Sequence, residues 1–342
     1  MPLPTTISPD FDDMTSALPF DDFRNLMSRL PAGDEAAGER VRAQFARAEK
    51  PRESLGRLEE LAAWLASWSG RPPAVNRPLV AIFAGNHGVA RHGVSPQPVE
   101  ATARAVELTA AGGAAINQLC LAYDIGLKVF DLALHLPTED ITQDAALDER
   151  GCAATMAFGM EAISGTDLLC IGDLGVGNST VAATMLAAIH GGTGADWVGQ
   201  GSGADAGMVV RKAQVVDAAL SFHAGHLRDP LEVLRRVGGR EFAAIAGAIL
   251  AARMEKIPVM LDGFAAMAAA SVLQALSPRA LEHCMIAQLS PEPGYRKAVE
   301  KLGMKPLLDL GIAHGEGAGA ALAAGLARAA ALCSSGMAAA LR

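Results

Sequence analysis

The chain has 342 residues, of which 51% are hydrophobic and 4% aromatic, and its 29 basic and 37 acidic side chains give a net charge of −8. This balance excludes a sequence-independent nucleic-acid binder, which needs a basic surface. The high apolar fraction excludes disorder over most of the chain. The length fits about two domains of ~150 residues, or one large α/β unit.

The five cysteines are scattered and form no CxxC pair, and no spacing of His, Asp or Glu resembles a metal site. The sequence therefore predicts neither a zinc site nor a redox pair. Met1–Phe20 lacks the charged-then-apolar pattern of a signal peptide. No run approaches 18 uncharged apolar residues of membrane type, and the nearest, Gly317–Cys333, is interrupted by Arg328. We expect a cytoplasmic globular protein with no membrane partner.

Residues 1–35 are polar, acidic and contain proline, which predicts an arm or a loosely attached start. A helical stretch is predicted from about Glu35. Within it Leu55, Leu58, Leu61 and Leu65 recur at three and four residues, the spacing of an amphipathic helix. Arg71-Pro72-Pro73 ends this stretch as a connector.

Short apolar runs then alternate with alanine-rich helical runs, and each apolar run is followed by glycine, acidic or polar residues. The runs are 79–83, 127–130, 168–171, 257–261 and 285–287. Near-continuous apolar strands separated by helices are typical of a parallel sheet covered on both faces. In such sheets ligands bind at the carboxyl ends of the strands, so the clusters that follow the runs are predicted to form one site.

The predicted fold is a three-layer α/β/α domain with a mainly parallel, Rossmann-like sheet over residues 75–310. A smaller, discontinuous helical subdomain is predicted from residues 1–74 together with 311–342.

The stretch from Gly172 to Thr180 (GDLGVGNST) lies between a predicted strand and a predicted helix over Val181–Ile189. Its glycines allow close backbone approach to an anion, and the helix start offers free N–H groups. Asn178 or Ser179 is a candidate N-cap. The loop matches neither GxGxxG nor GxxxxGK[ST], so a phosphate cradle and a tight turn without a ligand both remain open.

Two further glycine-rich loops precede predicted helices. Gly199–Gly203 (GQGSG) comes before a helix that carries Arg211 and Lys212, which suits a second anionic group, although lysines on helices are usually solvated. The stretch from Gly315 to Ala320 (GEGAGA) opens the last helix and superficially matches a dinucleotide fingerprint. The strand that should follow such a fingerprint is missing.

The composition does not decide the roles of two residues, Glu316 and His87. Glu316 is either a surface group stabilised by the helix dipole or a base that must approach a substrate. His87, in Gly85-Asn86-His87-Gly88, follows a predicted strand and is either catalytic or a packed structural histidine.

Taken in order, these clusters resemble the nicotinate-nucleotide:dimethylbenzimidazole phosphoribosyltransferase family. The matching stretches cover roughly residues 50–335: Lys50-Pro51, Ser54–Glu59, His87–Val89, Gly93–Ser95, Gly112–Asn117, Gly175–Thr180, Asp229–Leu234, Pro258–Phe264, Glu292–Gly294, Pro306–Leu310 and Gly315–Gly317. The resemblance implies transfer of phosphoribose from β-nicotinate mononucleotide to 5,6-dimethylbenzimidazole. The products are α-ribazole 5′-phosphate and nicotinate, and the route leads to the lower ligand of cobalamin. The resemblance implies a homodimer, and it implies no metal or cofactor.

The resemblance also assigns roles by motif. Glu316 matches the general base, and Asp173 stands where the family usually has a glutamate that could stabilise positive charge at the sugar. Phosphate and ribose contacts fall on Gly175, Gly177, Asn178 and Ser179. Further substrate contacts match Gly201, Gly203, Lys212, Ser290 and Glu292, and the benzimidazole pocket maps onto Ser95 and Gln97 with His87 nearby.

The sequence departs from the family pattern at two positions. Asn86 stands where the family often has aspartate, and Asp173 is one methylene shorter than the usual glutamate. The residue before the Gly-Glu-Gly triplet, here His314, is variable. Two alternatives stay open: the same transfer to another aromatic base, such as adenine or a phenol, and a non-catalytic nucleotide-binding module.

Overall fold

The computed structural model describes residues 18–340, with side chains to residue 337. Its sheet has five parallel strands in the order β2-β1-β3-β4-β5. They are β1 (Pro78–Ala84), β2 (Gly126–Asp131), β3 (Leu168–Leu174), β4 (Val259–Leu261) and β5 (Cys284–Ile286). Every residue of β1 and β3 is buried, whereas the edge strand β2 is partly exposed. All five predicted strands and the parallel sheet are confirmed.

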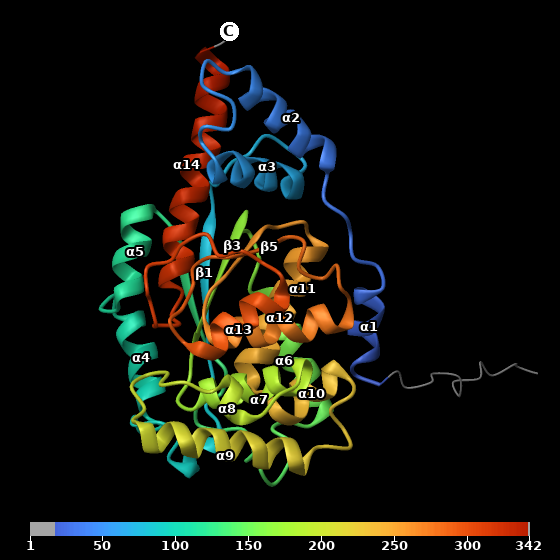
Figure 1. Ribbon diagram of the computed structural model, residues 1–342, viewed down its shortest axis with the longest axis vertical. Helices are drawn as coiled ribbons and strands as arrows, with labels where there is room; N and C mark the ends of the chain where they lie inside the picture. Colours follow the sequence, from blue (N-terminus) through green and yellow to red (C-terminus); the bar gives the residue numbers. More distant parts are fainter. Residues whose placement is uncertain (1–17, 341–342) are drawn as a thin grey trace, which may run out of the picture.

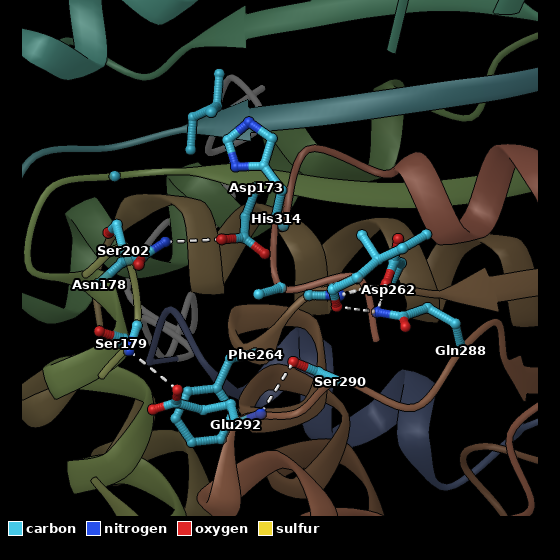
Figure 2. A pocket seen from close by; sticks show the side chains of 17 residues that line it. Asp173, Asn178, Ser179, Ser202, Asp262, Phe264, Gln288, Ser290, Glu292 and His314 are labelled. Carbon is cyan, nitrogen blue, oxygen red and sulfur yellow. Dashed lines mark hydrogen bonds between the residues drawn. The ribbon is translucent and has the colours of Figure 1, made fainter. Parts of the chain in front are cut away.

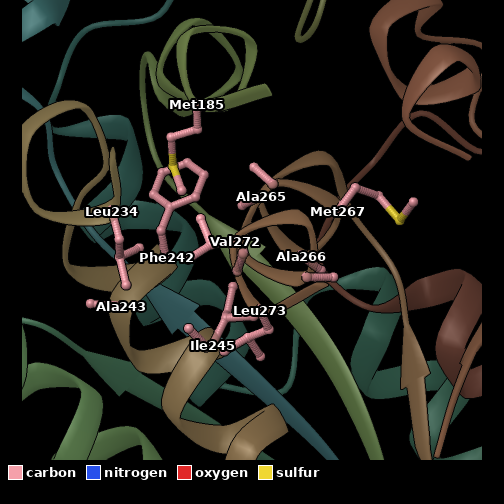
Figure 3. Close-up of a cluster of buried hydrophobic side chains, with 14 of the residues drawn as sticks. Met185, Leu234, Phe242, Ala243, Ile245, Ala265, Ala266, Met267, Val272 and Leu273 are labelled. Atoms are coloured by element: carbon pink, nitrogen blue, oxygen red, sulfur yellow. The ribbon is translucent and has the colours of Figure 1, made fainter. Parts of the chain in front are cut away.

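Helices cover one face of the sheet with a large hydrophobic core (Figure 1). Alternate strand residues such as Phe83 and Ile171 point into this core, as the two-residue period of a strand requires. The helices are α6 (Glu149–Glu161), α7 (Asn178–His190), α8 (Gly194–Trp197), α9 (Ala206–Phe222), α10 (Pro230–Val237), α11 (Arg240–Met254), α12 (Phe264–Leu276) and α13 (Pro293–Leu302). Figure 3 shows Phe242 of α11 packed among side chains of α7, α10 and α12.

The other face carries a second core, into which Val80, Ile82 and Cys170 point. The long helix α14 (Ala318–Ala340) packs across β1, β3 and β4, and beyond the sheet it contacts α2 and α3 (Figure 1). The other helices on this side are α2 (Glu35–Arg47), α3 (Arg57–Ser69), α4 (Ala101–Ala110) and α5 (Ala115–Tyr123). The two cores with the sheet between them form the predicted three layers. The proposed division into residues 75–310 and 1–74 with 311–342 stays a prediction.

The expectation of a loosely attached start is wrong for residues 18–35. Helix α1 (Asp21–Met27) buries Phe20 and Phe23 in the larger core. Arg24 also bonds to Asp229 at the start of α10, with 2.6 Å between Nη2 and Oδ2. These contacts are tertiary, so local polarity could not reveal them. The earlier part of the predicted arm, residues 1–17, lies outside the described residues.

Two predicted helical segments differ in detail. The stretch that begins at Glu35 forms two helices, α2 and α3, because Pro51 lacks a backbone donor and Gly56 adopts a positive φ of 51°. The last helix begins at Ala318 rather than Gly315, so Glu316 precedes it.

Helix α14 contains the apolar stretch that Arg328 interrupts. Over Ala318–Met337 it is long and apolar enough, by length and composition, to span a membrane. Its inner face is buried against the sheet and against α3 and α5. Alanines on that face, from Ala320 to Ala331, allow the close packing of a core helix.

Candidate active site

A cavity of about 300 Å³ opens at the carboxyl ends of β3, β4 and β5 (Figure 2). The cavity lies at the edge of the sheet where the sequence predicts that ligands bind. Its lining comes from the β3–α7 loop, the start of α12, the segment after β5 and the loop before α14. The lining residues are Asp173, Leu174, Gly175, Asn178, Ser179, Gly201, Ser202, Asp262, Gly263, Phe264, Gln288, Ser290, Glu292, Ile312, Ala313, His314 and Gly315.

One end of the cavity is formed by the loop that leads into α7. Gly177 is the N-cap of this helix and has a φ of 87°, a left-handed conformation that favours glycine. The expectation that Asn178 or Ser179 caps the helix is therefore wrong. The amide of Asn178 instead donates to Oδ1 of Asp173 over 2.7 Å. The N–H groups of Asn178 and Thr180 donate to the carbonyls of Gly175 and Gly177, and the N–H and hydroxyl of Ser179 suit a phosphate.

Lys212 of α9 supplies a cation at the same end. Its side chain is buried, and Nζ donates to Oγ of Ser179 (3.1 Å) and to the carbonyl of Gly199 (2.7 Å). Burial lowers the pKa of Lys212, and the nearby charge of Glu292 opposes that shift. Within residues 18–337 no carboxylate forms an ion pair with this ammonium, so an anionic group near Ser179 would give it a directly bonded charged partner.

Glu292 and Ser290 form the opposite wall at this end. Oε2 of Glu292 accepts from the backbone N–H of Gly201 over 3.0 Å, and the N–H of Glu292 donates to Oγ of Ser290 over 3.3 Å. Oε1 of Glu292 is buried without a hydrogen-bond partner among the described residues. A ligand hydroxyl is the kind of group that would satisfy it.

Two further carboxyl groups of the cavity lining are buried, and one of them, Asp173, adjoins the loop before α7 through Asn178. Burial, followed by the charge of Glu241, raises the pKa of Asp173 to about 8. Burial raises the pKa of Asp262 to about 6, against hydrogen bonds from the N–H groups of Ala320 and Gly263 and from the amide of Gln288. A pKa near 8 favours the protonated form of Asp173 at neutral pH. Its Oδ2 has no partner within residues 18–337.

Glu316 lies beside the cavity, outside its lining. Its side chain is 5% exposed, its Oε1 accepts from the N–H of Ile116 (3.3 Å), and its Oε2 lies 3.3 Å from Nε2 of His314. His314 itself lines the cavity next to Asp173 (Figure 2). The hydrogen bond that His314 donates to the carboxylate of Glu316 raises the pKa of His314, and burial opposes this shift.

The other predicted site residues lie away from the cavity lining. His87 is buried, with Nε2 2.5 Å from Oε1 of Glu241 on α11. Ser95 follows the short helix η1 (Gly88–His92), and its Oγ accepts from the N–H of Gln97, which is exposed. Gly203 is exposed in the loop before α9.

The structure adds residues that the sequence reasoning did not select. Asp262 and Phe264 sit directly after β4, in a cluster that the strand-end rule had already flagged. Gln288 follows β5 in the same way. Glu241 had a weaker signal, as the one acid in the mostly apolar sequence of α11. The described residues contain no group of three or more His, Cys, Asp or Glu side chains placed to hold a metal ion.

Comparison with known proteins gives one consistent family. A family model described as a phosphoribosyltransferase matches residues 30–341. The chain is 61% identical over 324 residues to the nicotinate-nucleotide--dimethylbenzimidazole phosphoribosyltransferases of Rhizobium meliloti (strain 1021) and Sinorhizobium medicae (strain WSM419), covering 94% of this chain and 96% of each relative. A crystal structure of the Thermus thermophilus enzyme of that name superposes with a TM-score of 0.81 at 37% identity, over 88% of this chain and 96% of that one. The chain therefore belongs to the phosphoribosyltransferase family that includes these enzymes.

Proposed function

We propose that this protein transfers phosphoribose from β-nicotinate mononucleotide to 5,6-dimethylbenzimidazole, which yields α-ribazole 5′-phosphate and nicotinate for the lower ligand of cobalamin. Family membership supports the reaction class, and the 61% identity to enzymes of that name supports the substrates. The observation that carries the proposal is the layout of the cavity. An anion cradle at Ser179, to which Lys212 donates a hydrogen bond, shares one cavity with the buried carboxyl groups of Asp173 and Asp262.

The cradle suits the nucleotide's phosphate. The loop Gly175–Ser179 and the start of α7 present N–H groups, and Lys212 with Gly201 closes the far side. Ser290 and Glu292 line the same cavity, and the unsatisfied acceptor oxygen of Glu292 suits a ribose hydroxyl. Gly177 serves by its backbone conformation, and Gly203 completes the flexible loop before α9. These contacts position the sugar, which supplies catalysis by proximity.

The carboxyl groups in and beside the cavity suit the transfer itself. As a benzimidazole nitrogen forms a bond to C1′ of the ribose, the C1′–N bond to the pyridinium ring breaks. The electron pair of that bond neutralises the pyridinium, so nicotinate leaves without needing an acid. The acceptor's other nitrogen must lose its proton, and Glu316 takes it as a general base.

Asp173 faces the side of the cavity where positive charge develops on the sugar. The protonated carboxyl cannot stabilise that charge, whereas the ionised carboxylate can. The pyridinium cation of the bound nucleotide favours the ionised form. We infer that nucleotide binding releases a proton from Asp173.

The acceptor pocket is proposed to involve Ser95 and Gln97, with His87 nearby. These two residues lie on a surface segment after η1 and outside the described cavity. The same transfer to another aromatic base, such as adenine or a phenol, depends on this segment.

A homodimer is proposed from the family resemblance. Large apolar side chains support it, because Leu121 of α5 and Leu332 of α14 are 80% and 65% exposed on neighbouring helices. A cytoplasmic location is proposed as well. The five cysteines are all unpaired, as is common in a reducing compartment.

The test is incubation of the full chain with nicotinate mononucleotide, with and without dimethylbenzimidazole, while released nicotinate is measured. We expect nicotinate release that depends on the acceptor. Release with adenine or a phenol but without benzimidazole would move the assignment to another base. Tight binding of the nucleotide with no release under any acceptor would identify a nucleotide-binding module instead.

A further inference from the structure

His314 and Glu316 form an ion-pair geometry across a single glycine. Nε2 of His314 lies 3.3 Å from Oε2 of Glu316, and the two side chains differ sharply in exposure, at 67% and 5%. The carboxylate of Glu316 is thus shielded from water, whereas the imidazole of His314 is exposed to it.

Burial of a carboxylate disfavours its ionised form unless nearby groups compensate. Two groups do so here. The N–H of Ile116, at the start of α5, donates to Oε1, and His314 contacts Oε2. The first contact is fixed by the backbone. The second depends on a side chain at a position that the family motif leaves variable.

We propose that His314 is a positioning residue that keeps the carboxylate of Glu316 ionised and oriented toward the acceptor, so that the base works at a lower pH than it would alone. The inference rests on the proposed function, in which Glu316 removes the acceptor's proton.

The charges around the pair agree with this role. The pKa of His314 is raised, first by its hydrogen bond to Glu316 and also by the charges of Glu316 and Asp173. The imidazole is therefore cationic throughout the acidic range in which a carboxylate gains its proton. Asp173 lies on the other side of Gly315 and is itself protonated in that range, because its pKa is raised to about 8. Among the described residues, the cation that contacts Glu316 is thus His314.

The experiment compares the pH dependence of kcat/KM for nicotinate release in the wild type and three variants. His314→Leu removes the charge and the hydrogen bond, and His314→Lys keeps a positive charge. The matched control is His135→Leu, a substitution at an exposed histidine away from the cavity. Ionisation of the substrates affects every variant equally. Because the charge of His314 also lowers the pKa of Asp173, the same variants are compared in the Asp173→Asn background, where a shift of the acid limb reports on Glu316.

We expect His314→Leu to move the acid limb up by roughly 0.5–1 pH unit, because an opposite charge at 4–6 Å shifts a carboxyl by 1–3 units and exposure of the imidazole reduces that effect. In the Asp173→Asn background this is a loss of about 3- to 10-fold below the limb, and near pH 8 the rates should agree within about 2-fold. His314→Lys should restore most of the shift, and His135→Leu should leave the profile unchanged.

A uniform loss at every pH in His314→Leu, or an unmoved acid limb, would overturn the inference. A second measurement needs no turnover. The NMR chemical shift of the Glu316 carboxyl carbon is followed against pH in protein with labelled glutamate. The signal is assigned by its loss in Glu316→Gln. Its midpoint should rise in His314→Leu. If the wild type releases no nicotinate, the proposed function fails instead, and if Glu316→Gln stays fully active, the base assignment fails.

Discussion

The backbone N–H of Asp173, the penultimate residue of β3, donates a 2.8 Å hydrogen bond to the carbonyl of Gly315. This bond joins the central strand to the loop that carries Glu316. Gly172 makes the junction tight, because a side chain there would lie 2.7 Å from the backbone carbonyl carbon of Glu316. The position of the proposed base is therefore set by the sheet, even though Glu316 comes after the last strand.

Glu316→Gln tests the proposed base. The amide keeps the volume and the contact with Ile116 but cannot accept a proton, so we expect nicotinate release to fall by about 10²–10⁴-fold. Binding of nicotinate mononucleotide should remain, because its cradle is formed by the loop Gly175–Ser179 and not by Glu316. Turnover is measured beside the melting temperature. A fully active variant with slightly lower stability would show that Glu316 is only structural and would move attention to Asp173.

Gly177→Val tests the phosphate cradle. The φ of 87° is strained for any residue with a side chain, and valine would also press on Val89 and Val94. We expect mononucleotide binding to be lost, whereas Ser179→Ala should weaken it only modestly, since backbone N–H groups hold most of the phosphate. Calorimetric titration with the nucleotide measures both.

The matched control is Gly165→Val, since Gly165 has a similar φ of 82° and open space around it, far from the cavity. It should lose some stability but bind the nucleotide normally. Normal binding by Gly177→Val would place the phosphate elsewhere.

Local sequence was sufficient for the sheet but not for every contact in the site. The β1 and β3 runs are continuous and apolar, so burial on both faces could be predicted from them. Asn178 is a good helix cap by preference, yet its amide is taken by Asp173, a contact that only the fold creates. Glu241 escaped notice because its partner, His87, lies 154 residues away in the chain. Likewise the burial of α1 depends on α10, so its polar sequence was misleading.

Lys212→Met tests the buried cation. Methionine fills similar space without charge, and a hydrogen bond to a charged group contributes about 1.5–3 kcal/mol. We expect the Kd for nicotinate mononucleotide to rise by roughly 10- to 150-fold, with a smaller change in kcat. Arg211→Met is the control, because Arg211 is the neighbouring residue but donates to the carbonyl of Gly93, outside the cavity lining. Equal losses in both variants would indicate a general effect of charge on α9.

Asp173→Asn tests the buried acid through stability as well as turnover. The folded protein keeps the Asp173 proton up to a pKa of about 8, whereas an unfolded aspartate loses it near 3.8. Between these values the folded state binds more protons, so the contribution of Asp173 to stability is present at low pH and is lost as the pH rises toward 8. Asparagine stays neutral and can still accept the hydrogen bond from Asn178.

We therefore expect Asp173→Asn to be more stable than the wild type at pH 8, with a free energy of unfolding higher by a value on the order of 1–3 kcal/mol and a higher melting temperature. The difference should shrink toward pH 5. Asp144→Asn, at an exposed aspartate, should show no such trend. If the ionised carboxylate stabilises positive charge on the sugar, the same variant should also bind nicotinate mononucleotide but release nicotinate more slowly. A stability difference that is equal at both pH values would mean that Asp173 is already ionised in the folded protein. Nucleotide binding would then release no proton from Asp173. Calorimetric titrations in buffers of different ionisation enthalpy would show this absence.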